Sequence, residues 1–128
     1  MTTIRRVTID SGAISAGGAA TAYSEVVRGR ILAVQINYPT NTCTVDLDSN
    51  NEFVAQKIMD LGAANTDATY YPRTPLHDYT GTAIDLSDAQ GGNTAMYGFF
   101  EVWGRIKLTI ASGTEAETVS VYVFVEEP

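Results

Sequence analysis

The sequence predicts an all-β fold, an antiparallel two-sheet sandwich, and three observations lead to this prediction. Leu, Ile, Val and Phe total 30 of the 128 residues and Thr supplies another 16, a bias that favours strands over helices. Apolar and polar residues alternate along several segments. Clusters of Gly, Pro, Asn and Asp separate these segments at short intervals, as in sandwiches of the jelly-roll-like or immunoglobulin-like type.

The N-terminal residues predict a short strand followed by a flexible arm. Ile4, Val7 and Ile9 are the apolar members of a strand over residues 3–10. Residues 11–21 are mostly Ser, Gly, Ala and Thr, with too little apolar surface to become ordered alone. We therefore expect an N-terminal strand and Gly/Ala-rich arm over residues 1–22, ordered by a partner, and a β-sandwich domain over residues 23–128. A simple linker is the alternative.

A first hairpin is predicted around a loop at residues 39–42. Its two strands have apolar residues at alternate positions: Leu32, Val34, Ile36, Tyr38, Cys43, Val45 and Leu47. Pairing Val34 with Leu47 places these side chains on one face and polar side chains on the other, which is typical of a sheet that is solvated on one side.

A longer hairpin is predicted over residues 101–126, around a loop at residues 112–115. Pairing Leu108 with Val119 and Ile106 with Val121 gives one aliphatic face. The opposite face then carries aromatic and basic residues: Trp103, Arg105, Lys107, Tyr122 and Phe124. Because Trp, Tyr and Arg are common at the centre of interfaces, this face either packs on the same chain or meets another subunit.

The middle of the chain gives weaker signals. Residues 53–61 fit a bulged strand or a two-turn helix, and we expect the strand; residues 62–67 and 87–94 read as loops, with a short strand at 82–86. Pro72, Pro75 and Gly81 predict turns. We expect an aromatic loop packed on the body, with four residues able to hold a sugar or a protein. They are Tyr70, Tyr71, Arg73 and Tyr79.

The charge distribution excludes some partners. A net charge of −7 argues against binding to nucleic acid or to anionic membranes. Residues 1–30 carry four arginines and two acids, and such a basic segment suits contact with an acidic protein. The candidate interface residues of this segment are Ile4, Arg5, Arg6, Val7 and Ile9. Solvated arginines without a partner are the alternative.

Catalytic chemistry is poorly represented. His77 and Cys43 are the single histidine and the single cysteine, so no internal disulfide forms and a structural zinc centre lacks ligands. Residues 46–50 resemble the start of a calcium loop, but Lys57 stands where the loop needs a bidentate acid. We expect no catalytic residue, no cofactor and no metal, although a looser calcium site near Asp46, Asp48 and Glu52 stays open.

The order of several segments resembles the small β-sandwich decoration (cement) proteins of tailed bacteriophage capsids. The Gly/Ala-rich lead-in is followed by GRILAVQINY (29–38), YYPR (70–73), DYTG (78–81), WGRIKLTI (103–110) and a Val-rich final segment. The resemblance implies a non-enzymatic virion protein, made in the host cytoplasm, that binds the major capsid protein on the outer capsid surface. It further implies a homo-oligomer, a trimer rather than a dimer.

Two other classes of function stay open at this point. One is a carbohydrate-binding β-sandwich module that uses the loop at residues 70–79. The other is a small hydrolase built around His77. No run of residues resembles a secretory signal, and no apolar stretch reaches the roughly 20 residues that cross a bilayer.

Overall fold

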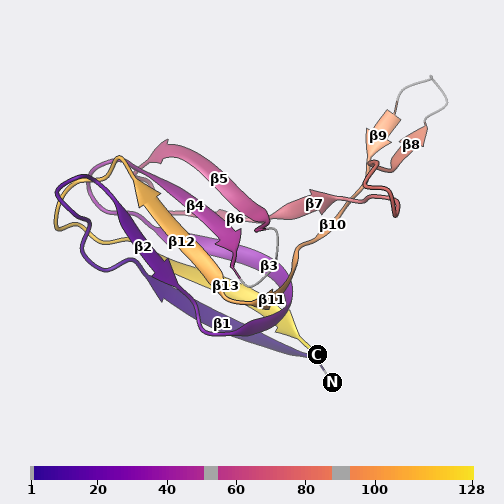
Figure 1. Cartoon of the computed structure of the whole chain (residues 1–128), viewed down its shortest axis with the longest axis horizontal. Helices are drawn as coiled ribbons and strands as arrows, with labels where there is room; N and C mark the ends of the chain where they lie inside the picture. Colours follow the sequence, from indigo (N-terminus) through magenta and orange to yellow (C-terminus); the bar gives the residue numbers. More distant parts are fainter. Residues whose placement is uncertain (1, 51–54, 88–92) are drawn as a thin grey trace.

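The all-β prediction is confirmed by the computed structural model, which describes residues 2–50, 55–87 and 93–128 (Figure 1). All regular structure in these ranges is β-strand. In chain order the strands are β1 (Thr3–Asp10), β2 (Ala20–Tyr23), β3 (Val27–Asn37), β4 (Cys43–Ser49), β5 (Lys57–Ala64), β6 (Ala68–Tyr70), β7 (Arg73–Pro75), β8 (Asp85–Ser87), β9 (Asn93–Ala95), β10 (Tyr97–Phe99), β11 (Glu101–Gly104), β12 (Ile106–Ala111) and β13 (Ser120–Glu127).

Nine of these strands form two antiparallel sheets that pack on each other. Sheet A has the order β1-β13-β3-β11, and β6 pairs with the same edge of β3 as β11 does. Sheet B has the order β2-β12-β4-β5. The core between them consists of the inward side chains of both sheets. Its fully buried members include Val7, Ile9, Ile31, Val34, Leu47, Ile106, Leu108, Val121 and Val123.

The predicted pairing of the last two long strands is wrong. Val121 pairs with Ile36 of β3, while Leu108 pairs with Leu47 of β4. β12 and β13 therefore lie in different sheets, and their apolar faces meet across the core. The alternation of residues marked the inward face correctly, but two apolar faces can meet side by side or across a sandwich, and alternation alone does not distinguish these arrangements.

The same correction applies to the hairpin predicted around residues 39–42. β3 belongs to sheet A and β4 to sheet B, so this connection also crosses the sandwich. The expected inward side chains of both strands are buried, with one exception. Leu32 is half-buried, because the register between β3 and β13 shifts there and places Ile31 inside. A bulge of this kind reverses which residues face the core.

The N-terminal segment is not a separate arm. β1 has the predicted bounds and pairs with β13 along its whole length, from Thr3 opposite Glu127 to Asp10 opposite Ser120. Ile14 is buried, and its backbone exchanges hydrogen bonds with the loop before β13. Residues 2–22 are thus part of the sandwich, and the prediction of a flexible arm outside the domain is wrong.

Two small residues allow this segment to close onto the body. Gly18 has a φ of 82°, and a Cβ there would lie 2.9 Å from the carbonyl oxygen of Gly113. The Gly113 N–H in turn donates to the Gly18 carbonyl at 2.9 Å. Gly and Ala, which suggested disorder in the sequence, instead permit close contact between two backbone segments.

The strand predicted within residues 53–61 is confirmed over residues 57–61, while residues 55 and 56 precede it. β5 begins at Lys57 and continues past Leu61 to Ala64, into residues that were expected to form a loop. Residues 53 and 54 lie outside the described ranges. Two register irregularities interrupt the pairing of β5 with β4.

Residues 71–87 and 93–99 leave the sandwich as a narrow projection, visible at the upper right of Figure 1. The chain leaves sheet A after β6 and returns at β11. These two strands lie along the same edge of β3, and the projection separates them in the sequence. It contains two short antiparallel pairs, β7 with β10 and β8 with β9. The expected loop packed on the body is therefore a projecting element instead.

Candidate functional site

The projection exposes many apolar side chains. Tyr79 is 100% exposed, and Tyr71 and Tyr97 are exposed by more than half. Leu76, Ile84 and Phe99 are exposed as well. None of the buried core residues that the structure describes lies between residues 71 and 99. The part of the projection that the structure describes therefore contributes no residue to the buried core, and the six apolar side chains named here are exposed.

Backbone hydrogen bonds hold the projection in shape. The N–H groups of Leu76 and Ile84 donate to the carbonyls of Met96 and Leu76, each at 2.8 Å. At the turn, Asp78 Oδ1 accepts the Thr80 hydroxyl at 2.6 Å and the N–H groups of Thr80 and Thr82 at 2.9 and 3.1 Å. The Thr80 hydroxyl, followed by these N–H groups, lowers the pKa of the Asp78 carboxyl group.

The base of the projection is fixed by Arg73. Its guanidinium group lies 4.3 Å from the centroid of the Phe99 ring, which is a cation–π contact. Its Nη1 donates to the carbonyls of Pro72 at 2.7 Å and Leu32 at 3.3 Å. Leu32 is the bulged residue of β3, so the bulge supplies a carbonyl that anchors the projection to sheet A. Arg73, a predicted ligand residue, therefore has a structural role.

The outer face of sheet A is the second exposed apolar area. Trp103 is 61% exposed and Ile4 is 65% exposed, and Tyr122 is exposed beside the half-buried Phe124. The guanidinium group of Arg6 lies 4.6 Å from the Tyr122 ring centroid. This face joins Ile4, Arg6, Trp103, Tyr122 and Phe124, five of the nine residues that were predicted to form an interface.

A hollow of about 510 Å³ lies at one end of this face. Its lining includes Arg28, Gly29, Arg30 and Trp103 together with Glu101 and Glu126. Gly29 has a φ of 151°, and a Cβ there would collide with the carbonyl oxygen of Glu126. Only glycine lets β3 approach β13 this closely, and the approach brings the arginines on both sides of it to the hollow.

The other predicted interface residues have different positions. Val7 and Ile9 are buried in the core, so the prediction that they form an interface is wrong. Their inward orientation follows from the pairing of β1 with β13. Arg105 is exposed at the bend between β11 and β12. The single face that was expected to join Trp103 and Lys107 does not exist, because these two residues belong to different sheets.

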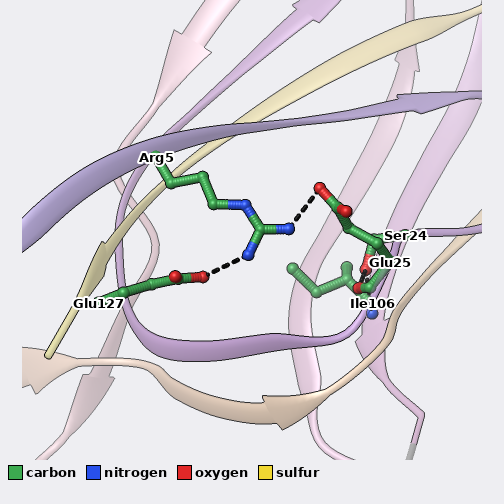
Figure 2. A network of polar contacts seen from close by, with 5 residues as sticks. All are labelled: Arg5, Ser24, Glu25, Ile106 and Glu127. Carbon is green, nitrogen blue, oxygen red and sulfur yellow. Dashed lines mark hydrogen bonds and ion pairs between the residues drawn. The ribbon is translucent and has the colours of Figure 1, made fainter.

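Arg5 closes the open end of the sandwich (Figure 2). Its guanidinium group forms ion pairs with Glu25 and with Glu127, the latter at 2.7 Å. Ser24 positions Glu25, since its Oγ accepts the Ile106 N–H at 2.8 Å and its N–H donates to the Ile106 carbonyl at 2.9 Å. The glutamate partners raise the pKa of Arg5. This residue links three strand ends of its own chain.

The predicted tyrosine site is not assembled as one loop. Tyr70 is half-buried and packs against the core, and Tyr71 is exposed at the base of the projection. Tyr79 lies beyond β7, in the Asp78 turn. The predicted tyrosines are therefore distributed from β6 to the Asp78 turn. Leu76, Tyr97 and Phe99, which were not predicted, accompany Tyr79 on the projection instead.

The outer face of sheet B carries an acidic group around Lys57. Lys57 Nζ lies 3.1 Å from Asp48 Oδ1 and 3.7 Å from Asp46 Oδ2. Asp60 stands directly opposite Asp46 in the pairing of β4 with β5. Burial raises the pKa of Asp46, and the carboxyl group of Asp60 adds to this effect.

No metal site is formed by the residues that the structure describes: no three His, Cys, Asp or Glu side chains are placed to share an ion. Glu52, part of the looser calcium site that the sequence left open, lies outside the described ranges. Cys43 is buried in the core, where burial raises the pKa of its thiol. His77 is exposed on the projection.

Comparison of the chain with protein-family models, with curated protein sequences and with solved structures finds no match. Within the described ranges, no helix has the length and apolar character needed to cross a bilayer.

Proposed function

We propose that this chain is a non-enzymatic virion structural protein, a capsid decoration or cement protein that binds the outside of a phage head and stabilises the shell. Its implied partner is the major capsid protein. The observation that carries the proposal is the projection: its described residues expose six large apolar side chains and include none of the buried core residues. Such a surface is typical of a protein that works by contact with neighbouring subunits.

The composition of the exposed surfaces supports this interpretation. Tyrosine and tryptophan, the residues that dominate the energy of protein interfaces, are exposed at Tyr71, Tyr79, Tyr97, Trp103 and Tyr122. Arg73 stiffens the base of the projection, so less conformational entropy is lost on docking than with a free loop.

The net charge supports a position on the outer surface. A chain of charge −7 is repelled by the phosphates of packaged DNA. On the outside of a shell that repulsion is absent, and the exposed arginines on the outer face of sheet A are available to protein carboxylates.

The direct test is attachment to shells assembled from the major capsid protein encoded in the same genome. The protein should sediment with these shells at a fixed ratio to the capsid protein and should raise the temperature at which they open. A variant in which residues 74–98 are replaced by a short Gly-Ser turn should attach at least about 30-fold more weakly, the effect of losing a central contact of about 2 kcal/mol.

A matched control uses exposed tyrosines in two places. Tyr97→Ser alters the projection, and Tyr23→Ser alters an exposed ring on sheet B. Only the first should weaken attachment. If the unaltered protein does not sediment with the shells, or if its attachment leaves their opening temperature unchanged, the proposed function is wrong.

A further inference from the structure

Two surfaces of this chain expose large apolar side chains that no other described part of the same chain covers. The described part of the projection exposes Tyr79 and Tyr97, and the outer face of sheet A exposes Trp103, Tyr122 and Ile4. Figure 1 shows that the projection extends away from the sandwich, so it does not cover the face of its own chain. A contact between the two surfaces therefore requires two molecules.

The two surfaces also differ in charge. Between residues 74 and 99 the sequence contains three aspartates and no lysine, arginine or glutamate. One of them, Asp78, is exposed next to Tyr79 at the turn. The outer face of sheet A carries Arg6, Arg28 and Arg30, and at the hollow Glu101 and Glu126 lie beside the last two. The attraction between the two surfaces is therefore local: it depends on the carboxylate of Asp78 and on an arginine of the hollow that has no ion pair of its own among the described residues.

The arginines on this face are available for such a contact. Arg28 is exposed, and it forms no ion pair with any residue that the structure describes. Arg30 has one exposed partner, Glu101, at 3.6 Å. Arg28 and Trp103 stand opposite each other in the pairing of β3 with β11, so a free cation and an exposed aromatic ring border the same hollow.

The hollow has the size that a side chain from a partner requires. Its volume of about 510 Å³ is in the range of pockets that hold small ligands, about 300–1,000 Å³. Tyr79 is the most exposed apolar side chain of the described residues, and the neighbouring Asp78 supplies a carboxylate. A tyrosine ring stacked on Trp103 would bring that carboxylate towards Arg28.

We propose that Asp78 and Tyr79 in the projection of one copy dock into the hollow bordered by Arg28 and Trp103 on a second copy. The contact is head-to-tail, because the two docking surfaces are different parts of the chain. Repetition of the contact produces a closed ring if the rotation between copies permits, and an open chain otherwise. This inference deepens the proposed function. It rests on that function only in placing the contact between copies on the surface of a shell.

The test uses two half-defective variants of the full chain. Tyr79→Ser removes the docking side chain and leaves the hollow intact, while Arg28→Glu replaces the unpaired cation of the hollow by a carboxylate and leaves the projection intact. The unaltered protein should be oligomeric by sedimentation velocity. Each variant alone should associate at least about 30-fold more weakly, as for a central interface residue.

The decisive sample is an equimolar mixture of the two variants. One intact projection and one intact hollow remain in the mixture, so it should contain a one-to-one dimer that neither variant forms alone. Tyr23→Ser, an exposed tyrosine outside both surfaces, should associate like the unaltered protein. Equal melting temperatures of all variants exclude loss of the fold as the cause.

Two outcomes overturn this inference: a monomeric unaltered protein, or variants whose mixture stays monomeric although each is folded. The second outcome would indicate a symmetric contact or a different surface. Failure here is distinct from failure of the proposed function, because a monomer that attaches to shells contradicts only the head-to-tail contact. If the two variants restore association with each other but the unaltered protein does not attach to shells, only the proposed role on the capsid is contradicted.

Discussion

The sandwich and the projection consist of the same kind of antiparallel strands, yet different forces keep them folded. In the sandwich, alternate side chains of β3, β12 and β13 are buried between two sheets. In the projection, backbone pairing and the Asp78 turn define the shape, while Leu76, Ile84 and Tyr97 are exposed. The comparison separates apolar residues that stabilise the fold from apolar residues that remain available to a partner.

The largest difference should appear when a leucine is shortened in each region. Leu108→Ala in β12 leaves a cavity in the core and should lower the free energy of unfolding by about 3 kcal/mol. Leu76→Ala, on the projection, should change it by less than about 0.5 kcal/mol. Urea denaturation measures both values. A similar loss in the two variants would mean that the projection contributes to the core.

The variant Ile14→Ala tests whether the N-terminal segment contributes to the stability of the sandwich. Because Ile14 is 2% exposed, the variant should lose about 2 kcal/mol of stability. Ile4→Ala, at an exposed position of the same segment, is the control and should lose less than about 0.5 kcal/mol. Equal, small losses in thermal or urea unfolding would restore the interpretation of this segment as an arm outside the domain.

A smaller effect is expected at the acidic group on sheet B. The folded-state pKa of Asp46 is raised, so its ionisation opposes folding at neutral pH. This penalty is lost as the pH falls through the raised pKa to the ordinary value of 3.8. Asp60→Asn should raise the stability at pH 7 by about 0.5 kcal/mol, the size of a cross-strand like-charge repulsion.

The gain from Asp60→Asn should decrease on acidification, as measured by urea denaturation between neutral pH and the titration range of carboxyl groups. Asp10→Asn, an exposed carboxylate of sheet A, serves as the control. A gain that does not depend on pH would show that Asp46 and Asp60 do not interact.

The smallest effect is expected at the turn of the projection. The Thr80 hydroxyl lowers the pKa of Asp78, so any stability that this carboxylate gives the turn is present above its ordinary pKa of 3.8 and is lost as the pH falls through the lowered value. Thr80→Val should return the pKa of Asp78 towards its ordinary value without changing the unfolding of the sandwich. Carboxyl NMR titration measures the shift, and an unchanged pKa would contradict the role of the hydroxyl.

The sequence predicted which residues face the core more accurately than which strands pair. Val34, Val45 and Leu108 are buried as expected, because alternation depends only on local geometry. The predicted strand partners were wrong, because alternation shows only which face of a strand is buried. It does not show whether two such strands are neighbours in one sheet or lie in opposite sheets. The prediction for Leu32 was wrong for another reason: Leu32 is the extra residue of a bulge in β3, and alternation within one strand does not reveal a shift of register with its partner.

The candidate site was only partly predictable for the same physical reason. Trp103 and Tyr122 were identified because aromatic residues occurred at positions expected to face outward. Tyr97 and Phe99 were missed because they lie on short strands without a buried face, so no alternation marks them. The position of the projection depends on Arg73 and on the bulge at Leu32, a contact across 41 residues that composition does not reveal.

The division of one sheet edge between β6 and β11 has a consequence for aggregation. A long free edge is a template on which strands of other molecules can add and form fibrils. Here the edge of β3 is covered by strands of three and four residues, separated where the chain leaves at Pro72. Neither piece is long enough to support an extended ladder, so this edge of sheet A is a poor template for the addition of a strand from another molecule.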